Sequence, residues 1–248
     1  MGTLQFKTAS PPLKTKIDQS TVAGSPPDKD FSRRRIAADK LRLLGVRLLS
    51  AAGMSHDDAA MVSEHVGGNS LMGVDSHGVV RFSQYMSLIE SGAIDPLGTP
   101  LVVVDDAAMT RIDAGGGHGV PAMVQLAECT AQKASTAGMA TGALVNCGHT
   151  GRIGAYAEMI ARQGCFAVII GGGGHTRGNP KVAPYGGREG IMGTNPYTLA
   201  LPGGPTGVVV VDFATSTSAQ GKLLAASKTG EPLPVSYTHL TLPTNREV

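Results

Sequence analysis

The stretch ATGALVNCGHTGRIGAYAEMIARQGCFAVII, residues 140–170, decides the fold class of this chain. It opens with the apolar run ATGALVN, continues with a helical pattern from Arg152 to Gln163, and closes with a second apolar run, CFAVII. Short apolar and β-branched runs that alternate with helical patterns are typical of α/β domains. The stretch therefore predicts a strand, a helix and a second strand, in that order.

The same alternation extends outward from this stretch in both directions. On the N-terminal side lie the runs LVVV and TRID and a helical stretch from Pro121 to Ala137, and on the C-terminal side lies the run VVVVDF, residues 208–213. The buried strands of α/β sheets have continuous apolar runs of this kind. We therefore expect an α/β domain over residues 99–234, with a largely buried sheet.

Two helical patterns precede this domain. The first extends from about Asp30 to a glycine stop at Gly53. The second begins with a capping-box pattern at Ser55 and ends near Gly73. Residues 30–98 are therefore predicted to form a helical domain.

The two ends of the chain differ from the rest. Residues 1–29 are polar and rich in Pro, Ser and Thr, so they bury too little apolar surface to offset the entropy lost on ordering, and we expect a flexible leader. The last segment, VSYTHLTLPTNREV, has no helical period and no stop signal. We expect the native sequence to stop near Pro234 and residues 235–248 to be a non-native tail, which would make this chain a fragment.

The composition argues against several classes of protein. The formal net charge is +2 and Trp is absent, so the chain lacks the basic stripe and the aromatic stackers of a nucleic-acid-binding protein. No apolar run is long enough to span a bilayer, so no membrane role is expected. The three cysteines, Cys129, Cys147 and Cys165, form no CxxC pair and cannot all form disulfides. This favours a reducing compartment, and we expect a cytoplasmic protein.

Two glycine-rich loops have the composition of phosphate-binding turns. Residues 117–122, GHGVPA, fit the pattern GxGxxA between a possible strand and a helical stretch. The next strand, ATGALVN, supplies no acidic residue to bind a ribose, and Pro121 suits the first turn of a helix, so a tight structural turn explains the loop equally well. The run GGGG, residues 171–174, follows CFAVII but fails the spacing. Neither loop predicts a Rossmann fold.

Residues 76–81, SHGVVR, carry the strongest candidate site. If a helix begins near Ser76, then His77, Arg81 and Tyr85 lie four residues apart on one face of it. A guanidinium can hold a carboxylate in bidentate fashion, while an imidazole passes a proton to or from a neighbouring oxygen. The reduction of a 2-oxo acid requires these two functions and a hydride donor. Ser76 either caps the helix or orients His77, and a capped surface helix with an incidental histidine is the structural alternative.

Polar side chains also occur where two other strands begin or end. His149 follows the strand ATGALVN, where ligands gather in α/β sheets, although a lone histidine there is more often a capping or loop residue. Asp212 ends the run VVVVD and is expected either to bind a ribose or to cap the next helix. Thr194 and Asn195 lie in a sequence, GTNP, that is typical of a turn.

Two other chemistries lack their sequence signatures. No metal site is predicted, because no tight ligand spacing and no neighbouring cysteine pair exists for His77, His118, His149 and His175. The nucleophile elbow GxSxG of hydrolases is missing. Ser76 directly precedes His77, which is poor geometry for a nucleophile and its base.

Four ordered motifs resemble the malate/L-lactate dehydrogenase family that is unrelated to the Rossmann-type lactate dehydrogenases: DSHGVVRFSQYMSLIESG, NCGHTGRIGAYAEMIARQG, VAPYGGREGIMGTNP and VVVVDFATSTSAQGK. Relatives include ureidoglycolate, sulfolactate and 2,3-diketogulonate dehydrogenases and a cyclic imino-acid reductase. The resemblance covers about residues 31–230. It implies a non-Rossmann NAD(P)-binding α/β domain, packed with a helical, substrate-side domain built from both chain ends, in a homodimer or larger assembly.

The resemblance also implies a role for each matching residue. Ser76, His77 and Arg81 match the substrate-side motif, with His77 as proton donor or acceptor, Arg81 as carboxylate clamp and Tyr85 as a neighbour. His149 matches a position that is the proton acceptor in some members and a cofactor contact in others, so the choice between the two histidines stays open. The positions that match cofactor-lining residues are Thr150, Gly151, Thr194, Asn195, Asp212, Phe213 and Ala214.

Three differences from relatives bear on the activity. The loop 171–181 is longer than in several of them and is expected to reshape access to the site. Lys222 stands where imino-acid-reducing relatives carry an acidic relay residue, which favours a hydroxy-acid substrate. Family members also continue well beyond Pro234, with a segment that completes the helical domain and adds cofactor contacts. Without that segment we expect weak cofactor binding and little turnover.

The predicted function is therefore that of an oxidoreductase that uses NAD or NADP to interconvert a small 2-hydroxy acid, malate-like or lactate-like, and its 2-oxo acid. The alternative from another class is an inactive fragment or a non-catalytic module that binds a nucleotide or a carboxylate. The sequence does not distinguish NAD from NADP, because it contains no ribose-binding fingerprint.

Overall fold

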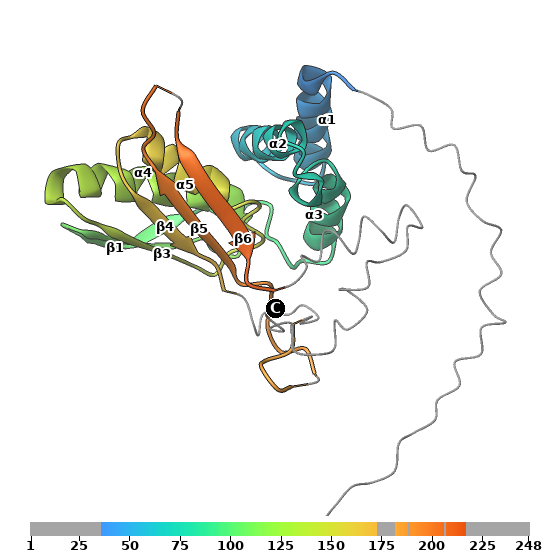
Figure 1. The fold of residues 1–248 in the computed structure, drawn as a ribbon. Helices are drawn as coiled ribbons and strands as arrows, with labels where there is room; N and C mark the ends of the chain where they lie inside the picture. Colours follow the sequence, from blue (N-terminus) through green and yellow to red (C-terminus); the bar gives the residue numbers. More distant parts are fainter. Residues whose placement is uncertain (1–35, 173–181, 188, 206, 217–248) are drawn as a thin grey trace, which may run out of the picture. The chain divides into compact units, whose positions relative to one another are not determined.

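Helices lead the described part of the chain, and strands alternate with helices from residue 101 onward (Figure 1). The computed structural model describes residues 36–172, 182–187, 189–205 and 207–216. The predictions for the leader, for Lys222, for most of the loop 171–181 and for residues 235–248 lie outside the described residues. The predicted α/β class is confirmed.

The first described helix, α1 (Ala38–Ala51), begins after Ala37, whose ψ of 136° is extended rather than helical. The predicted helix start near Asp30 lies outside the described residues. The predicted glycine stop is confirmed: the helix ends two residues before Gly53, whose φ of 102° suits glycine.

The second helix, α2 (His56–Leu71), begins at the predicted cap. The Ser55 hydroxyl accepts a hydrogen bond from the backbone N–H of Asp58 at 3.1 Å, which satisfies one of the free N–H groups of the first turn. After α2 the chain forms a 3₁₀ turn, η2 (Asp75–His77), and then α3 (Val80–Glu90).

The helix predicted to begin near Ser76 is wrong at its start. Gly78, between η2 and α3, has a ψ of −148°, which breaks the helical geometry. His77 therefore lies on η2 and does not share a helix face with Arg81 and Tyr85.

The first sheet contains β1 (Leu101–Asp106), β2 (Met109–Asp113) and β3 (Thr141–Val145) in that order. β1 and β2 are antiparallel, while β2 and β3 are parallel. A parallel pair needs a long crossover, and the helix α4 (Gly119–Ala137) supplies it. These strands and this helix agree with the predicted alternation.

The second sheet contains β4 (Ala167–Ile170), β5 (Pro196–Leu201) and β6 (Val209–Ala214), with antiparallel neighbours. β4 and β6 correspond to predicted runs, but β5 is not predicted. Its sequence, PYTLAL, begins with the proline of the turn-like GTNP, and proline is tolerated as the first residue of a strand.

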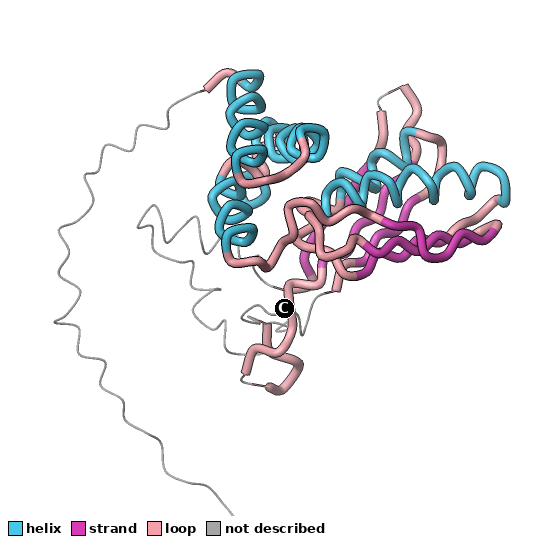
Figure 2. Tube along the Cα trace, turned by 180° about the vertical axis from the view of Figure 1, so that it is seen from behind, coloured by secondary structure: helices cyan, strands magenta, loops and turns pink. Residues whose placement is uncertain are grey.

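Two helices, α4 and α5 (Gly154–Arg162), cover one face of the strands. α4 packs on β2 and β3, and α5 packs on all three strands of the second sheet. Figure 2 shows both helices on the same side of the strands from behind. The buried apolar residues between them include Ile112, Ala122, Met123, Leu126, Ile153 and Tyr156.

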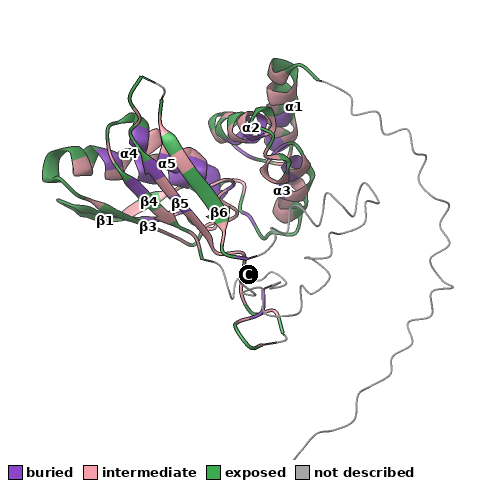
Figure 3. Ribbon diagram, viewed as in Figure 1, coloured by how far each residue is buried: buried purple, intermediate pink, exposed green. Residues whose placement is uncertain are grey.

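The expectation of a largely buried sheet is wrong for the described strands. The outer face of the second sheet is exposed, as the green surface of β6 shows in Figure 3. Antiparallel strands require only one covered face, whereas the prediction assumed parallel strands that are buried on both faces. The exposed apolar residues on this face are Phe166, Val168, Ile170, Leu201, Val209, Val211 and Phe213.

The helices α1 to α3 have a core of their own that includes a residue of α4. Leu49, Val62, Val66 and Tyr85 pack together with Val120, and all five are fully or almost fully buried. The helical part and the α/β part therefore belong to one compact unit, and α4 connects them.

Burial on the two faces of neighbouring strands predicts different effects of truncation. Ile112 on β2 is 0% exposed and Leu101 on β1 is 65% exposed. We expect Ile112→Ala to lower the free energy of unfolding by about 2–5 kcal/mol. Leu101→Ala should change it by less than about 0.5 kcal/mol. Urea denaturation of both variants checks this, and equal losses would contradict the assignment of the inner face.

Candidate active site

The turn between α2 and α3 presents Ser76 and His77. The side-chain amide of Asn69, on α2, donates to the backbone carbonyl of His77 at 3.1 Å. The Ser76 hydroxyl lies 3.1 Å from His77 Nδ1. Because α3 begins at Val80 without a side-chain cap, the contact with His77 supports the orienting role for Ser76 rather than the capping role.

Arg81, in the first turn of α3, is 4% exposed. Its Nε donates to the backbone carbonyl of Ser76 at 2.6 Å, and its Nη1 donates to the Gln84 side chain. Within the described residues Nη2 donates to no acceptor, so it is available to an anion. Burial, followed by the positive charges of Arg81 and Arg152, lowers the pKa of His77 to about 4.

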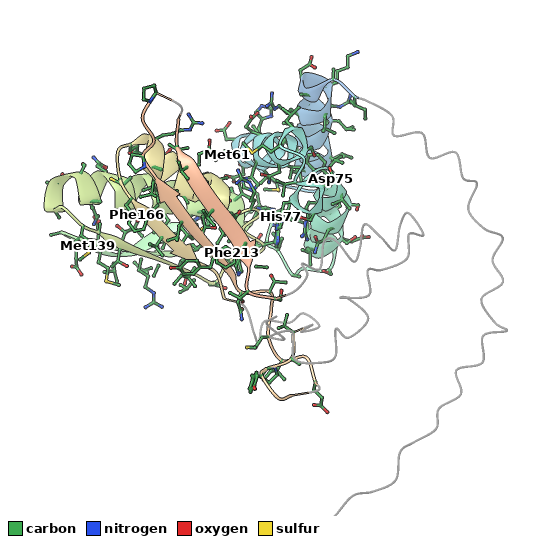
Figure 4. The ribbon with its side chains drawn as sticks, viewed as in Figure 1. Met61, Asp75, His77, Met139, Phe166 and Phe213 are labelled. Atoms are coloured by element: carbon green, nitrogen blue, oxygen red, sulfur yellow. The ribbon has the colours of Figure 1, made fainter. Side chains whose placement is uncertain are left out.

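Tyr85 joins the helical part to the loop that carries His149. It lies one turn after Arg81, is fully buried, and places its hydroxyl 2.9 Å from His149 Nδ1. The rings of His77 and His149 are stacked, with centroids 5.8 Å apart and planes 14° apart. Figure 4 shows His77 where the helices meet the α/β part. The structure therefore brings the predicted residues together, although they come from different elements.

The hydrogen bonds of His149 indicate which ring nitrogen carries the hydrogen. The backbone N–H of Gly151, which can only donate, points to His149 Nδ1 at 3.2 Å. Nδ1 is therefore the acceptor, and Nε2 carries the hydrogen of the neutral ring. Burial, followed by the positive charge of Arg81, lowers the pKa of His149 well below its usual value. The imidazole is accordingly neutral at pH 7.

Two further histidines belong to this cluster. His65, on α2, accepts a hydrogen bond at Nε2 from the backbone N–H of Arg152 at 3.0 Å, and its ring stacks on Tyr156. His118 caps α4, and its ring meets Tyr85 edge-on with centroids 4.3 Å apart. The sequence contains little signal for either: His118 lies in a glycine-rich loop, and His65 lies within an ordinary helical pattern.

The glycine-rich loop before α4 packs closely against other backbone segments. A Cβ added to Gly119 would lie 2.6 Å from the carbonyl oxygen of Gly148 and 2.9 Å from that of His149. The first turn of α4 is thus packed against the loop that carries His149. Of the two interpretations, the tight structural turn is the one that the geometry supports.

Three of the predicted cofactor positions take part in hydrogen bonds within the chain. The Thr150 carbonyl accepts from the Tyr156 hydroxyl at 2.5 Å, and Gly151 donates to His149. Asp212 Oδ1 accepts from the Thr198 hydroxyl at 2.5 Å, and its Oδ2 accepts from the first backbone N–H of α5 at 3.1 Å. Asp212 therefore caps a helix, but not the next one as predicted: it caps α5, whose first residue lies 58 positions earlier in the chain.

The remaining predicted cofactor positions lie at the ends of β5 and β6. Phe213 is 48% exposed, its ring contacts that of Tyr197, and it lies on the opposite face of β6 from Asp212. The carbonyls of Thr194 and Asn195 accept from the hydroxyl of Thr215. Among the described residues, no hydrogen bond joins these positions to the histidine cluster.

A cavity of about 220 Å³ opens between α2 and α5, beside the cluster. Arg152 lines it, donates from Nε to Asn69 at 2.8 Å, and lies 3.8 Å from Glu158 and 3.9 Å from Asp212. Both ion pairs are long, so the guanidinium is only loosely neutralised. The other lining residues include His65, Met72, Ala155, Met159 and Arg162.

Two other types of feature are absent from the part of the chain that the structure describes. No group of three or more His, Cys, Asp or Glu side chains there is arranged to hold a metal ion. None of its helices combines the length and the apolar character needed to cross a membrane.

The buried histidines predict a stability that falls in acid. The pKa values of His65 and His77 drop from 6.5 to about 4 on folding, first because of burial and then because of nearby positive charge. Between these pH values the unfolded chain binds more protons than the folded chain, so the free energy of unfolding decreases as the pH falls from 6.5 towards 4.

Urea midpoints measured across this pH range check the effect. We expect His65→Gln and His77→Gln each to flatten the slope of midpoint against pH, whereas His56→Gln, at the exposed start of α2, should leave it unchanged. A slope that is the same in all three variants and the parent would contradict the prediction.

Comparison with known proteins identifies the family. The family model for malate/L-lactate dehydrogenases matches residues 36–238. The malate dehydrogenase of Pyrococcus abyssi is 33% identical over 205 residues, which are 82% of this chain and 54% of that enzyme. The (2R)-3-sulfolactate dehydrogenase (NADP(+)) of Chromohalobacter salexigens is 30% identical over 82% of this chain and 60% of that enzyme.

A solved structure agrees with these matches. The crystal structure of the δ1-piperideine-2-carboxylate reductase from Pseudomonas syringae superposes with a TM-score of 0.73 at 29% identity, over 81% of this chain and 59% of that one. The chain spans a little over half the length of the relatives it matches. The match to the family model covers most of the chain, and the chain belongs to the malate/L-lactate dehydrogenase family.

Proposed function

We propose that the protein is an oxidoreductase that interconverts a small 2-hydroxy acid, malate-like or lactate-like, and its 2-oxo acid with NAD or NADP. The observation that carries this proposal is the grouping of the buried Arg81 and Tyr85 with the partly buried His77 and His149. A guanidinium binds a carboxylate, and a hydrogen-bonded phenol and imidazole can move a proton at the adjacent oxygen. Relatives named as malate and sulfolactate dehydrogenases support the same substrate class.

Arg81 would hold the substrate carboxylate. Its Nε and Nη1 are engaged by Ser76 and Gln84, which fix the plane of the guanidinium, while Nη2 stays available. Arg81 is 4% exposed, so a charge-assisted hydrogen bond that it forms is stronger than one formed at the surface. Ser76 would orient His77 beside the same carboxylate.

His149 would transfer the proton. In the direction of reduction, Nε2 gives its proton to the substrate oxygen while Nδ1 takes the proton of the Tyr85 hydroxyl, so the imidazole never carries a charge. This relay suits a ring whose pKa is far below 7. Burial raises the pKa of Tyr85 well above its usual value, and the charge of Arg81 opposes that rise. Arg81 would therefore stabilise the phenolate until it regains a proton from solvent after the product leaves. His77, stacked on His149, is the other candidate donor.

The chemistry of the cluster fits a pyridine nucleotide. Serine, histidine, tyrosine and arginine side chains supply protons and charge but no hydride. When bound, NADH or NADPH supplies a hydride to the 2-carbon. After burial, the largest influence on the pKa of His149 is the positive charge of Arg81, which suits an anionic ligand beside it. The residues that would hold it are Thr150, Gly151, Thr194, Asn195, Asp212, Phe213 and Ala214.

We extend the proposal to the cytoplasm as location and to a homodimer or larger assembly. Cys129, Cys147 and Cys165 are all free, as in a reducing compartment. The outer face of β4, β5 and β6 exposes the apolar residues described above, and exposed apolar patches of this kind mark surfaces that are covered by other chain segments or subunits.

An absorbance assay at the nicotinamide band tests the activity. The purified protein with NADH or NADPH should consume the reduced cofactor with at least one member of a panel of 2-oxo acids that includes oxaloacetate, pyruvate and 3-sulfopyruvate. No turnover across the panel would overturn the proposal. If NADH or a 2-oxo acid then raises the melting temperature without turnover, the non-catalytic binding module is the correct alternative.

Single substitutions separate the two roles. Arg81→Leu should raise the KM for the oxo acid by about 10- to 100-fold, because a charged hydrogen bond is lost. His149→Gln should lower kcat by about 100-fold or more while KM changes little. An unchanged KM in Arg81→Leu would exclude the role of Arg81 as carboxylate clamp. A larger loss of kcat in His77→Gln than in His149→Gln would show that His77, and not His149, transfers the proton.

A further inference from the structure

One face of α2 bonds to both of the segments that carry the site histidines. Asn69 donates to the backbone carbonyl of His77, and His65, one turn earlier, accepts from the backbone N–H of Arg152. Arg152 lies three residues after His149, and its Nε donates a second hydrogen bond to α2, to the side chain of Asn69 at 2.8 Å. Two adjacent residues of one helix face therefore connect the His77 turn and the His149 loop.

Asn69 uses both ends of its side chain. It is 2% exposed, and arginine Nε can only donate, so Asn69 Oδ1 must face Arg152 and Nδ2 must face the carbonyl of His77. The backbone carbonyl of Asn69 also accepts from Val74 at 2.9 Å, at the start of the same turn. An amide is the side chain that can satisfy a carbonyl on one side and a guanidinium on the other.

His65 fits against the His149 loop as closely. Its ring stacks on Tyr156 with centroids 5.4 Å apart and planes 13° apart. Gly151 has a φ of 71°, and a Cβ on it would overlap the ring of His65 at Nε2. The same Gly151 donates to His149 Nδ1, so the position of the His65 ring determines where this donor lies.

We propose that His65 and Asn69 are positioning residues that set the spacing and the stacking of His77 against His149. Arg81 belongs to the same assembly, because its Nε bonds to the carbonyl of Ser76 in the turn that Asn69 holds. The helix α2 thus aligns the carboxylate-binding arginine with the proton-transferring histidine. The catalytic consequence rests on the proposed function, whereas the geometric claim does not.

Substitutions of matched shape test the proposal. Asn69→Asp keeps the shape but replaces the donor towards the His77 carbonyl with an acceptor. His65→Leu removes the acceptor for Arg152, while His65→Gln restores an acceptor near the position of Nε2. The control is Ile112→Ala on β2, which is 0% exposed, destabilises, and lies outside the helical core that contains Tyr85.

In steady-state kinetics, Asn69→Asp and His65→Leu should each lower kcat by about 10- to 100-fold and shift the pH profile of kcat. His65→Gln should keep kcat within about threefold of the parent, since the hydrogen bond to Arg152 is retained. Ile112→Ala, measured well below its melting temperature, should leave kcat and the pH profile unchanged. If Ile112→Ala matched the effects of Asn69→Asp, a loss of stability alone would explain both, which would overturn the proposal.

Nuclear magnetic resonance of the ring signals separates this inference from the proposed function, because it needs no turnover. The parent chain should show cross-relaxation between the rings of His77 and His149. Asn69→Asp and His65→Leu should weaken it and shift the signals of both rings, while His65→Gln and Ile112→Ala should not. If the oxo acids are not turned over but the ring signals respond in this way, the proposed function fails and the positioning role stands. Ring signals unchanged in Asn69→Asp and His65→Leu would overturn it.

Discussion

The hydrogen bond between the Tyr85 hydroxyl and His149 Nδ1 is the interaction on which the rest of the site depends, because it crosses from α3 to the loop after β3. Tyr85 also belongs to the core of the helical part, packed with Val62 and Val66. A displacement of the helices relative to the strands would therefore break the bond. Catalytic geometry and core packing are coupled through one side chain, and the fold positions the site by holding this tyrosine.

The site also depends on histidines that stay uncharged. His65, His77, His118 and His149 lie close enough for their charges to interact, and the positive charges of Arg81 and Arg152 act on the same region. Burying several imidazolium ions together would destabilise the fold by far more than the packing of the rings stabilises it. Neutral rings fix their hydrogens by the donors around them, so the backbone N–H groups of Gly151 and Arg152 set the tautomers.

Local features of the sequence predict the fold better than the site. The cap at Ser55 and the apolar strands depend on neighbouring residues, and the structure contains them. The late start of α3 depends on the backbone conformation of Gly78. The strand β5 is not predicted because its first residue, Pro196, belongs to a sequence that is typical of a turn. Helical spacing predicts that His77 and Arg81 lie close together, which the structure confirms, but His77 lies on a separate turn and not on the helix of Arg81. The role of His65 depends on residues 87 positions away, which no local pattern contains.

The central claim is that two distant segments, one with His77 and Arg81 and one with His149, meet to form a single carboxylate site. Titration of the chain with oxamate, a stable analogue of a 2-oxo acid, tests this claim most directly. The ring signals of the histidines would be followed by nuclear magnetic resonance. The account predicts saturable shifts at His77 and His149, none at the exposed His56, and loss of all shifts in Arg81→Leu. Shifts confined to His56, or shifts that persist unchanged in Arg81→Leu, would contradict it.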